Sequence, residues 1–392
     1  MGLADLVVLD LASLAAAPQV AAFFGDFGAR VVKIEPPGGD PLRQLVDERG
    51  AAVQWKLVNR NKQCATLDVA RPEGRAVLER MLARADVLIS ALPATRLDAW
   101  GLGRAALRAQ YPRLVAVNLT TFGTSGPWRD RAGSGTLAEA ATGLAHLTGA
   151  ADGPPTLAPV GLGDWLGVQQ GIIAALLGLY ERDTGGSGEH FDVAMCDPLL
   201  GLMSQRLGQT ARSGVDPGRH GSRFPTMAAR NTYRTADGHW VALTAGTDDM
   251  VRRLFAAVGR PELADDPRFV DNRARLANTA AFDGIVGGWI ATHPRDAVIA
   301  AAAGARVSLA SVDDLPSVLA NPQFRARPTL IEADDPELGT ITTTAPLPFR
   351  TDHPGTIRHL GRPRGADNVA VYRDWLHMDD AELRNLAAAG VI

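Results

Sequence analysis

Cysteine is scarce in this chain of 392 residues. The two cysteines, Cys64 and Cys196, lie far apart and form no CxxC or Cys/His pattern, which argues against a disulfide framework and against a cysteine-based zinc site. The HExxH, GxSxG and P-loop motifs are missing as well. We therefore expect no metal ion and no permanently bound cofactor, in a protein suited to the reducing cytoplasm.

A large excess of charge is also missing. The formal net charge is only -3 at pH 7, which gives no support to nucleic acid or a membrane surface as a partner. No uncharged apolar run has the length of a membrane span, since the longest, 165–180, is interrupted by Gln169 and Gln170. The N-terminus lacks the basic region of a signal peptide. These absences favour an ordinary globular protein.

Strand and helix patterns alternate in the first half of the chain. The expected strands are 6–11, 30–36, 86–90 and 114–122, and the expected helices are 18–29, opened by Pro18, and 71–85. Such alternation predicts right-handed βαβ units and a largely parallel sheet. A further helix is expected after 196, with Asp197 as N-cap and Pro198 at its first position.

The chain is too long for one ordinary core, so two domains are expected. The character of the sequence changes near residue 206, and 211–233 is rich in Gly, Pro and Arg, as in a linker or a long functional loop. A hairpin around Asp237-Gly238 follows, and then helical patterns at 247–259 and 279–304.

A lone carboxylate, Asp164, lies in "PVGLGDWLGVQQGIIAALLGLYER" (159–182), at the start of an apolar helix. Asp is favoured at the N-cap, so a capping role and a chemical role are both open. No capping box supports the cap, because Gly167 stands where Glu or Gln would be needed. The neighbouring glycines would let a ligand approach, and a helix N-terminus would keep a nucleophilic carboxylate ionised.

Other candidate motifs are weaker. The segment "GLGRAA" (101–106) does not follow a strand pattern, which argues against a dinucleotide site. His146 is more typical of a structural histidine than of a catalytic base. The segment "NRNK" (59–62) is either a solvated turn or a phosphate-binding loop.

Several motifs, in order along the chain, resemble those of family III CoA-transferases, which include formyl-CoA and carnitine CoA-transferases and the related 2-methylacyl-CoA racemases. The matching segments are "VVLDLASLAAAPQVAAFFGDFGARVVKIEPPGGDPLR", "NRNKQCATLDVARPEGRAVLERMLARADVLI", "FGTSGPW", "GPPTLAPVGLGDWLGVQQGIIAALLGLYERDTGGSGEHFDVAMCD" and "LRNLAAAGVI". The resemblance covers essentially the whole chain. By position, it implies that Asp164 is the catalytic nucleophile.

The resemblance also implies a fold and an assembly. The fold is α/β, with a Rossmann-like large domain (1–205), a linker (206–225), a small α+β domain (226–325) and a C-terminal segment (326–392) that returns to the large domain. The implied assembly is an interlocked homodimer. The implied activity is CoA transfer from an acyl-CoA donor to a carboxylic acid acceptor, through aspartyl anhydride and aspartyl-CoA thioester intermediates.

The implied CoA contacts lie in three segments. Leu14, Ala15 and Ala16 would line the nucleotide, and Lys62 would face its phosphates. Relatives have an "ENFRPG"-like segment that contacts CoA, where this chain has "SALPATR" (90–96). Arg96 would replace the lost contact from a position that is offset in the sequence. The flap that covers the nucleophile in some members is represented only by "RHGSRFP" (219–225).

Two alternative functions stay open. A racemase needs a second base opposite Asp164, but Ser134 stands where racemases have a catalytic His, and neutral serine is too weak a base. Glu139 is the nearest replacement, on a helix expected to start near Thr136. The other alternative is a catalytically silent acyl-CoA-binding protein, suggested by the departures among the CoA contacts.

Overall fold

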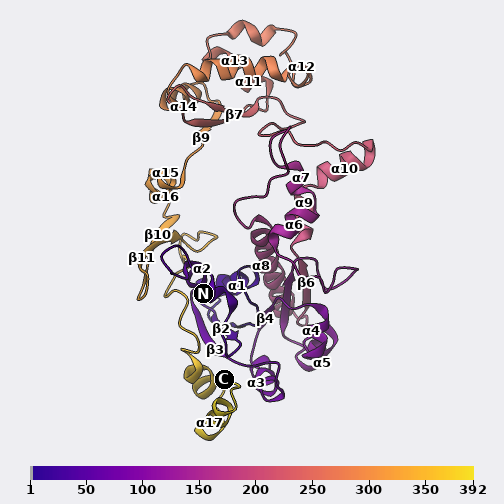
Figure 1. Ribbon diagram of the computed structural model, residues 1–392, viewed down its shortest axis with the longest axis vertical. Coiled ribbons are helices and arrows are strands. Elements are labelled where there is room, and N and C mark those ends of the chain that lie inside the picture. Colours follow the sequence, from indigo (N-terminus) through magenta and orange to yellow (C-terminus); the bar gives the residue numbers. More distant parts are fainter. Residues whose placement is uncertain (1–2) are drawn as a thin grey trace. The chain divides into compact units, whose positions relative to one another are not determined.

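The computed structural model describes residues 3–392 and divides into two compact units, whose elements are labelled in Figure 1. The large unit contains the residues up to Thr142 together with Ala158–Gln205 and Arg325–Ile392. The second unit contains Gly143–Leu157 and Arg206–Phe324. Boundaries near 205 and 325 were expected from the sequence, whereas the grouping of Gly143–Leu157 with the second unit was not.

A six-stranded, wholly parallel sheet forms the centre of the large unit, with the strand order β3-β2-β1-β4-β5-β6. The strands are β1 (Val7–Asp10), β2 (Arg30–Glu35), β3 (Lys62–Thr66), β4 (Val87–Ser90), β5 (Val115–Thr120) and β6 (His190–Ala194). This is the Rossmann strand order. From β1 the chain adds β2 and β3 on one side, and then β4, β5 and β6 on the other side, so the order of the strands reverses between β1 and β4. The predicted α/β class and parallel sheet are confirmed.

Helices connect the strands and cover the sheet. They are α1 (Ala16–Asp26), α2 (Val53–Val58), α3 (Pro72–Leu82), α4 (Ala94–Ala99), α5 (Arg104–Gln110), α6 (Gly135–Ala141), α8 (Leu162–Asp183) and α9 (Cys196–Leu202). Small residues let α8 lie close to its neighbours: a Cβ added to Gly171 would lie 2.8 Å from Val20, and one added to Gly178 would lie 2.8 Å from Val115. Such backbone approach requires glycine.

Helix α8 is long and apolar enough, by length and composition alone, to cross a membrane. The helix has this length because Gln169 and Gln170 do not interrupt it and because it includes charged residues near both ends, so the expectation about uncharged runs is not contradicted. However, 50% of its most apolar window is buried inside the protein. Core helices of soluble proteins have the same property.

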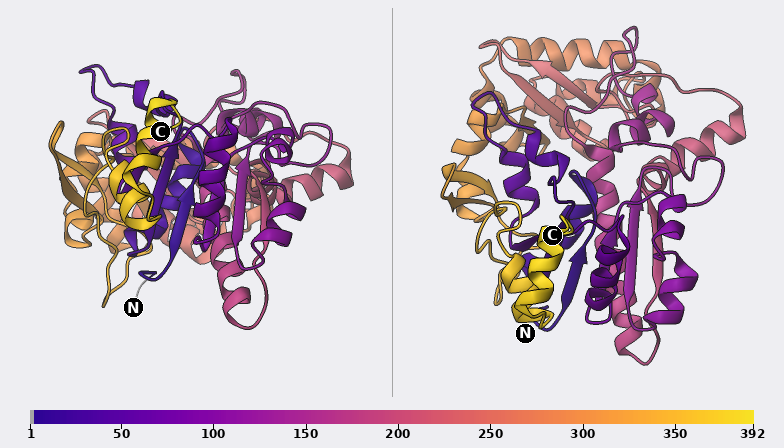
Figure 2. Two further views of the ribbon diagram at one scale, coloured as in Figure 1. Left: turned by 90° about the horizontal axis from the view of Figure 1, so that it is seen from below. Right: turned by 60° about the horizontal axis from the view of Figure 1, so that its bottom comes forward.

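The C-terminal segment of the large unit covers the edge strand β3. The Cys64 N–H donates to Asp367 Oδ2 at 2.8 Å, and the Thr66 N–H donates to Asn368 Oδ1 at 2.9 Å. Figure 2 shows this segment, which includes α17 (Asp380–Ala388), beside the first strands of the chain. Side-chain oxygens thus accept hydrogen bonds from backbone N–H groups that would otherwise have no partner at the edge of the sheet. Before this segment lies the antiparallel hairpin of β10 (Leu330–Asp335) and β11 (Gly339–Thr344).

The second unit is an α+β body built on an antiparallel sheet of the strands β7 (Arg230–Arg234), β8 (Trp240–Thr244) and β9 (Ser308–Ser311). Its helices are α7 (Leu144–Leu147), α11 (Asp248–Ala257), α12 (Asn272–Ala277), α13 (Thr279–Ala291), α14 (Arg295–Gly304) and α15 (Leu315–Ala320), while α10 (Ser204–Ser213) and α16 (Pro322–Ala326) cross its boundaries. The predicted hairpin at Asp237-Gly238 joins β7 to β8, and the core contains the mutually packed rings of Phe255, Phe269 and Phe282.

Three local expectations are wrong. Helix α1 starts at Ala16, so Pro18 lies within its first turn, where the missing N–H costs no helical hydrogen bond. Helix α9 has Met195 as N-cap, which places Asp197 inside the helix. The expected linker 206–225 is helical in its first part, because α10 extends to Ser213.

Candidate active site

Asp164 lies in the first turn of α8, as the third residue after the N-cap Gly161. It is therefore not the N-cap of its own helix. Its Oδ1 instead accepts a hydrogen bond of 3.1 Å from the N–H of Gly135, the first residue of α6. The carboxylate thus joins the starts of two helices, and its other oxygen accepts no hydrogen bond from the described residues.

Three glycines frame Asp164 because no other residue fits beside it. A Cβ on Gly135 would lie 2.3 Å from the Asp164 nitrogen, one on Gly161 would lie 2.6 Å from Oδ2, and one on Gly163 would lie 2.5 Å from the Gly135 oxygen. None of the three has a positive φ. These glycines therefore do not serve a left-handed backbone conformation; they allow close backbone approach around the carboxylate.

Glu139 of α6 makes the reciprocal contact. Its Oε1 accepts the N–H of Gly163 at 3.2 Å, and its Oε2 accepts the N–H of Ala158 at 3.3 Å. The residue is only 2% exposed. Each helix thus provides a carboxylate for the N–H groups at the start of the other, an arrangement that satisfies donors without an intrahelical partner. Because both Glu139 oxygens are bound and buried, the structure does not favour Glu139 as a racemase base.

The electrostatic environment raises the pKa of Asp164. Burial of the side chain is the largest cause, and the charge of Glu139 acts in the same direction, while the hydrogen bond from Gly135 opposes both. Burial therefore outweighs the hydrogen bond from Gly135 in setting the direction of the shift. Perturbed carboxyl groups of this kind are common at functional sites.

The residues expected to contact the nucleotide flank the point where the strand order reverses. Leu14 and Ala15 lie between β1 and α1, and Ala16 begins α1, while Arg96 lies in α4, after β4. Leu14 is 51% exposed with a positive φ of 65°, and Arg96 is exposed with its guanidinium 5.6 Å from the Trp100 ring. Ligands of open parallel sheets bind at such a reversal. The contacts with CoA themselves stay predictions.

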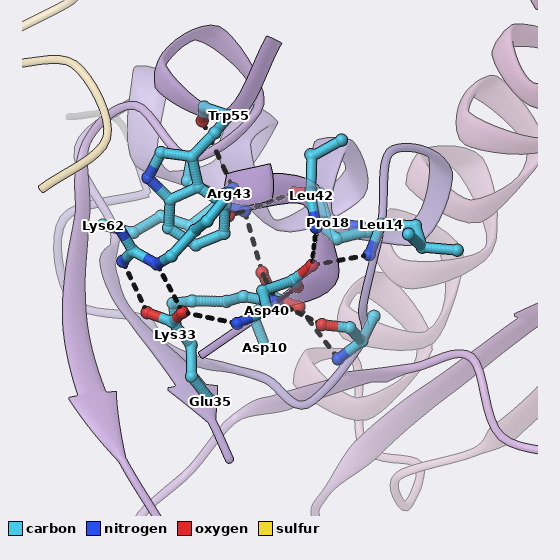
Figure 3. Close-up of polar contacts among 12 residues, drawn as sticks. Asp10, Leu14, Pro18, Lys33, Glu35, Asp40, Leu42, Arg43, Trp55 and Lys62 are labelled. Atoms are coloured by element: carbon cyan, nitrogen blue, oxygen red, sulfur yellow. Dashed lines mark hydrogen bonds and ion pairs between the residues drawn. The ribbon is translucent and has the colours of Figure 1, made fainter. Parts of the chain in front are cut away.

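A buried polar cluster supports the loop after β1 (Figure 3). The Leu14 N–H donates to Asp40 Oδ1 at 3.2 Å, and Asp40 forms an ion pair of 3.0 Å with Lys33. Burial acts to lower the pKa of Lys33, but the charges of Asp10 and Asp40 together raise it. Glu35 extends the cluster through a two-point hydrogen bond from Arg43.

Lys62 lies in the same cluster and is fully buried (Figure 3). Its Nζ donates to Asp10 Oδ2 at 2.8 Å, Pro18 O at 2.7 Å and Asn59 Oδ1 at 2.9 Å. An ammonium has three N–H donors, so none is left for a phosphate in this conformation. Burial also lowers the pKa of Lys62 to about 8. The phosphate contact stays a prediction, and it would require Lys62 to leave these partners.

Sequence reasoning overlooked Arg131, in the loop between β5 and Gly135. Its guanidinium lies 5.5 Å from the centre of the Phe122 ring and 5.0 Å from that of the Trp128 ring. The side chain is exposed, and no ion pair of Arg131 is present among the described residues, so its charge is not neutralised by a carboxylate. The aromatic residues that precede it in "FGTSGPWRDR" were the available signal.

No group of three or more His, Cys, Asp or Glu residues that could hold a metal ion occurs within 3–392. His146, the histidine considered as a base, pairs with Asp216 at 2.8 Å in the second unit. The site that the structure assembles is therefore the nucleophile candidate Asp164 with its backbone donor Gly135 and its buried neighbour Glu139.

Comparisons with known proteins give a consistent result. A sequence model of CoA-transferase family III matches residues 3–368. Succinyl-CoA–D-citramalate CoA-transferase from Chloroflexus aurantiacus is 34% identical over 391 residues, which cover 99% of this chain and 97% of that protein. Succinate–glutarate CoA-transferase from Agrobacterium fabrum is 30% identical over 368 residues, which cover 90% of this chain and 92% of that protein.

A solved structure agrees with these matches. The crystal structure of a CAIB/BAIF family protein from Brucella suis superimposes with a TM-score of 0.80 at 30% identity, and the match covers 95% of this chain and 98% of that chain. The family match extends over nearly the whole chain, and the sequence relatives are named as CoA-transferases. The protein therefore belongs to CoA-transferase family III and is a transferase enzyme.

Proposed function

We propose that the protein transfers CoA between carboxylic acids by covalent catalysis at Asp164. The observation that carries this proposal is the glycine frame, in which Gly135, Gly161 and Gly163 keep side chains away from one partly buried carboxylate. One of its oxygens is held by a backbone N–H and the other is free to attack. Covalent catalysis divides a difficult acyl exchange into easier steps.

In the first half-reaction, an Asp164 carboxylate oxygen attacks the thioester carbonyl carbon of the donor. The C–S bond breaks, CoA leaves as the thiolate, and an aspartyl–acyl anhydride remains. The thiolate then attacks Cγ of Asp164. The bond from Cγ to the bridging oxygen breaks, the donor acid leaves as a carboxylate, and Asp164 carries CoA as a thioester.

The second half-reaction reverses these steps with the acceptor. The acceptor carboxylate attacks Cγ of Asp164 and releases the CoA thiolate, which then attacks the acyl carbon of the new anhydride and restores the Asp164 carboxylate. Each attack on Cγ places negative charge on Oδ1. The Gly135 N–H already bound to this oxygen would stabilise that charge without rearrangement.

The relatives suggest the class of substrates. Their names pair succinyl-CoA with D-citramalate and mesaconate, and succinate with glutarate. We accordingly propose a small dicarboxylic acid for the acceptor and succinyl-CoA or a similar acyl-CoA for the donor. CoA would lie at the carboxyl ends of β1 and β4, beside Leu14, Ala15, Ala16 and Arg96.

A homodimer is part of the proposal. The outward face of α8 exposes Ile173, Leu177 and Tyr180, an apolar stripe of the kind that a second subunit covers. The family resemblance implies that the two chains interlock, and interlocked chains cannot separate without unfolding. The dimer should therefore persist on dilution to nanomolar concentration, and a folded monomer under those conditions would contradict it.

The decisive experiment is an exchange assay followed by mass spectrometry. Succinyl-CoA is incubated with a panel of mono- and dicarboxylic acids, and the expected products are new acyl-CoA esters together with a CoA adduct on the Asp164 peptide. Asp164→Asn is the control and should give neither product. A protein that binds acyl-CoA but yields no new ester would be a silent binding protein.

The racemase alternative is tested in heavy water. Racemisation requires loss and return of the C2 proton. Because Ser134 is no base and Glu139 is bound to backbone N–H groups, 2-methylacyl-CoA should gain no deuterium at C2. Rapid C2 exchange without CoA transfer would replace the proposed function with racemisation.

A further inference from the structure

Glu139 is a buried carboxylate that the proposed reaction steps do not use. No ion pair of Glu139 occurs among residues 3–392, and its described partners are two backbone N–H groups, those of Ala158 and Gly163. A buried charge without a cation is costly, so it needs several hydrogen-bond donors. One of its two donors belongs to the residue directly before Asp164.

We propose that Glu139 is a positioning residue whose carboxylate fixes the first turn of α8, and with it the Asp164 carboxylate, against the start of α6. This inference rests on the proposed function of Asp164. The N-cap of α8 is Gly161, which has no side chain to accept a hydrogen bond from the first turn. Glu139 supplies the missing acceptor from a different helix.

The two carboxylates hold each other's helix in place. Asp164, on α8, accepts from the first N–H of α6, and Glu139, on α6, accepts from the second residue of α8. The contact of Gly163 with the Gly135 carbonyl lets the two helix starts touch directly. If Glu139 is lost, the Gly163 N–H becomes unsatisfied and the hydrogen bond between Gly135 and Asp164 loses its support.

The charge of Glu139 has a role beyond its hydrogen bonds. The charge of Glu139 acts on Asp164 in the same direction as burial and raises its pKa. An uncharged acceptor could bind the same N–H groups with a smaller desolvation free energy than a buried carboxylate. The negative charge adds to the effect of burial and increases the proton affinity of Asp164, and a carboxylate of higher proton affinity is a stronger nucleophile.

The test compares Glu139→Gln, Glu139→Ala and the matched control Glu181→Gln, which neutralises an exposed glutamate near the end of the same helix. Glu139→Gln removes the charge and keeps one acceptor, so the acid limb of the kcat/KM profile should move to lower pH. Glu139→Ala frees the helix starts, and kcat should fall by about 10²-fold, as for a misplaced catalytic group, with little change in the KM for succinyl-CoA. Glu181→Gln should have the same kcat and the same acid limb of the kcat/KM profile as the wild type.

A stability measurement tests the same contact without activity. Asp164→Asn should raise the melting temperature more in the wild-type background than in Glu139→Gln, because the asparagine relieves repulsion only where the Glu139 charge is present. Equal increases in both backgrounds, or a Glu139→Gln enzyme with an unshifted acid limb, would overturn the inference. If the stability coupling is found but the wild type forms no adduct on Asp164, the positioning role stands and the covalent function fails.

Discussion

A single methyl group on Gly135 should disable the enzyme. In Gly135→Ala the new Cβ would lie 2.3 Å from the Asp164 nitrogen and 2.6 Å from both Cγ and Oδ2. Ordinary contacts begin near 3.4 Å, so the starts of α6 and α8 would have to separate by about 1 Å. Backbone atoms of a helix cannot turn aside as a flexible side chain can.

Two consequences follow from that separation. Overpacking of this kind costs about 1–3 kcal/mol of stability. The N–H···Oδ1 bond of 3.1 Å would also lengthen beyond hydrogen-bonding distance. Misplacement of a catalytic group by about 1 Å lowers the rate by about 10²-fold. We therefore expect a folded but less stable enzyme with at least that loss of kcat.

The assay measures succinyl-CoA consumption and thermal unfolding for Gly135→Ala beside the control Gly201→Ala. An alanine Cβ at Gly201, within α9, would meet no atom within 4 Å. That control should be as stable as the wild type or more stable, by up to about 1 kcal/mol, because alanine favours helix. Wild-type rate and melting temperature in Gly135→Ala would refute the close contact around Asp164.

Two further substitutions test the site and its support. Burial raises the pKa of Asp164, so the folded protein binds this proton more tightly than the unfolded chain, and stability falls as pH rises above the ordinary value of 3.8. Asp164→Asn should therefore abolish transfer yet raise the melting temperature at neutral pH, and a loss of stability there would contradict the argument. Lys62→Met should cost about 3–5 kcal/mol by leaving the buried Asp10 without its closest cation, as urea unfolding would measure. A stable Lys62→Met variant with only a raised KM for acyl-CoA would instead support the phosphate contact.

Much of the large unit could be predicted from sequence because its strands are buried on both faces. Such strands are nearly continuous apolar runs, as in 87–90 and 115–120, and they stand out between helical patterns. Asp164 was identified as the nucleophile candidate through the family resemblance. Its local pattern alone left a helix cap equally open.

The partners of the site residues were beyond sequence reasoning because they come from distant segments. Asp164 meets Gly135 across a separation of 29 residues, and Lys62 meets Asp10 across 52. Local patterns describe a residue's own helix or strand and not the element that packs against it. For this reason the sequence predicted a solvated turn or a phosphate-binding loop at 59–62 and not the buried partners of Lys62.

The pairing of β3 with the C-terminal segment has a consequence for biosynthesis. The N–H groups of Cys64 and Thr66 find their acceptors on Asp367 and Asn368, about 300 positions later in the chain. On the ribosome, β3 therefore keeps an open edge while residues 206–324, the larger part of the second unit, are synthesised. An open strand edge can pair with other nascent chains. We therefore expect chaperone binding to reduce aggregation most during this interval.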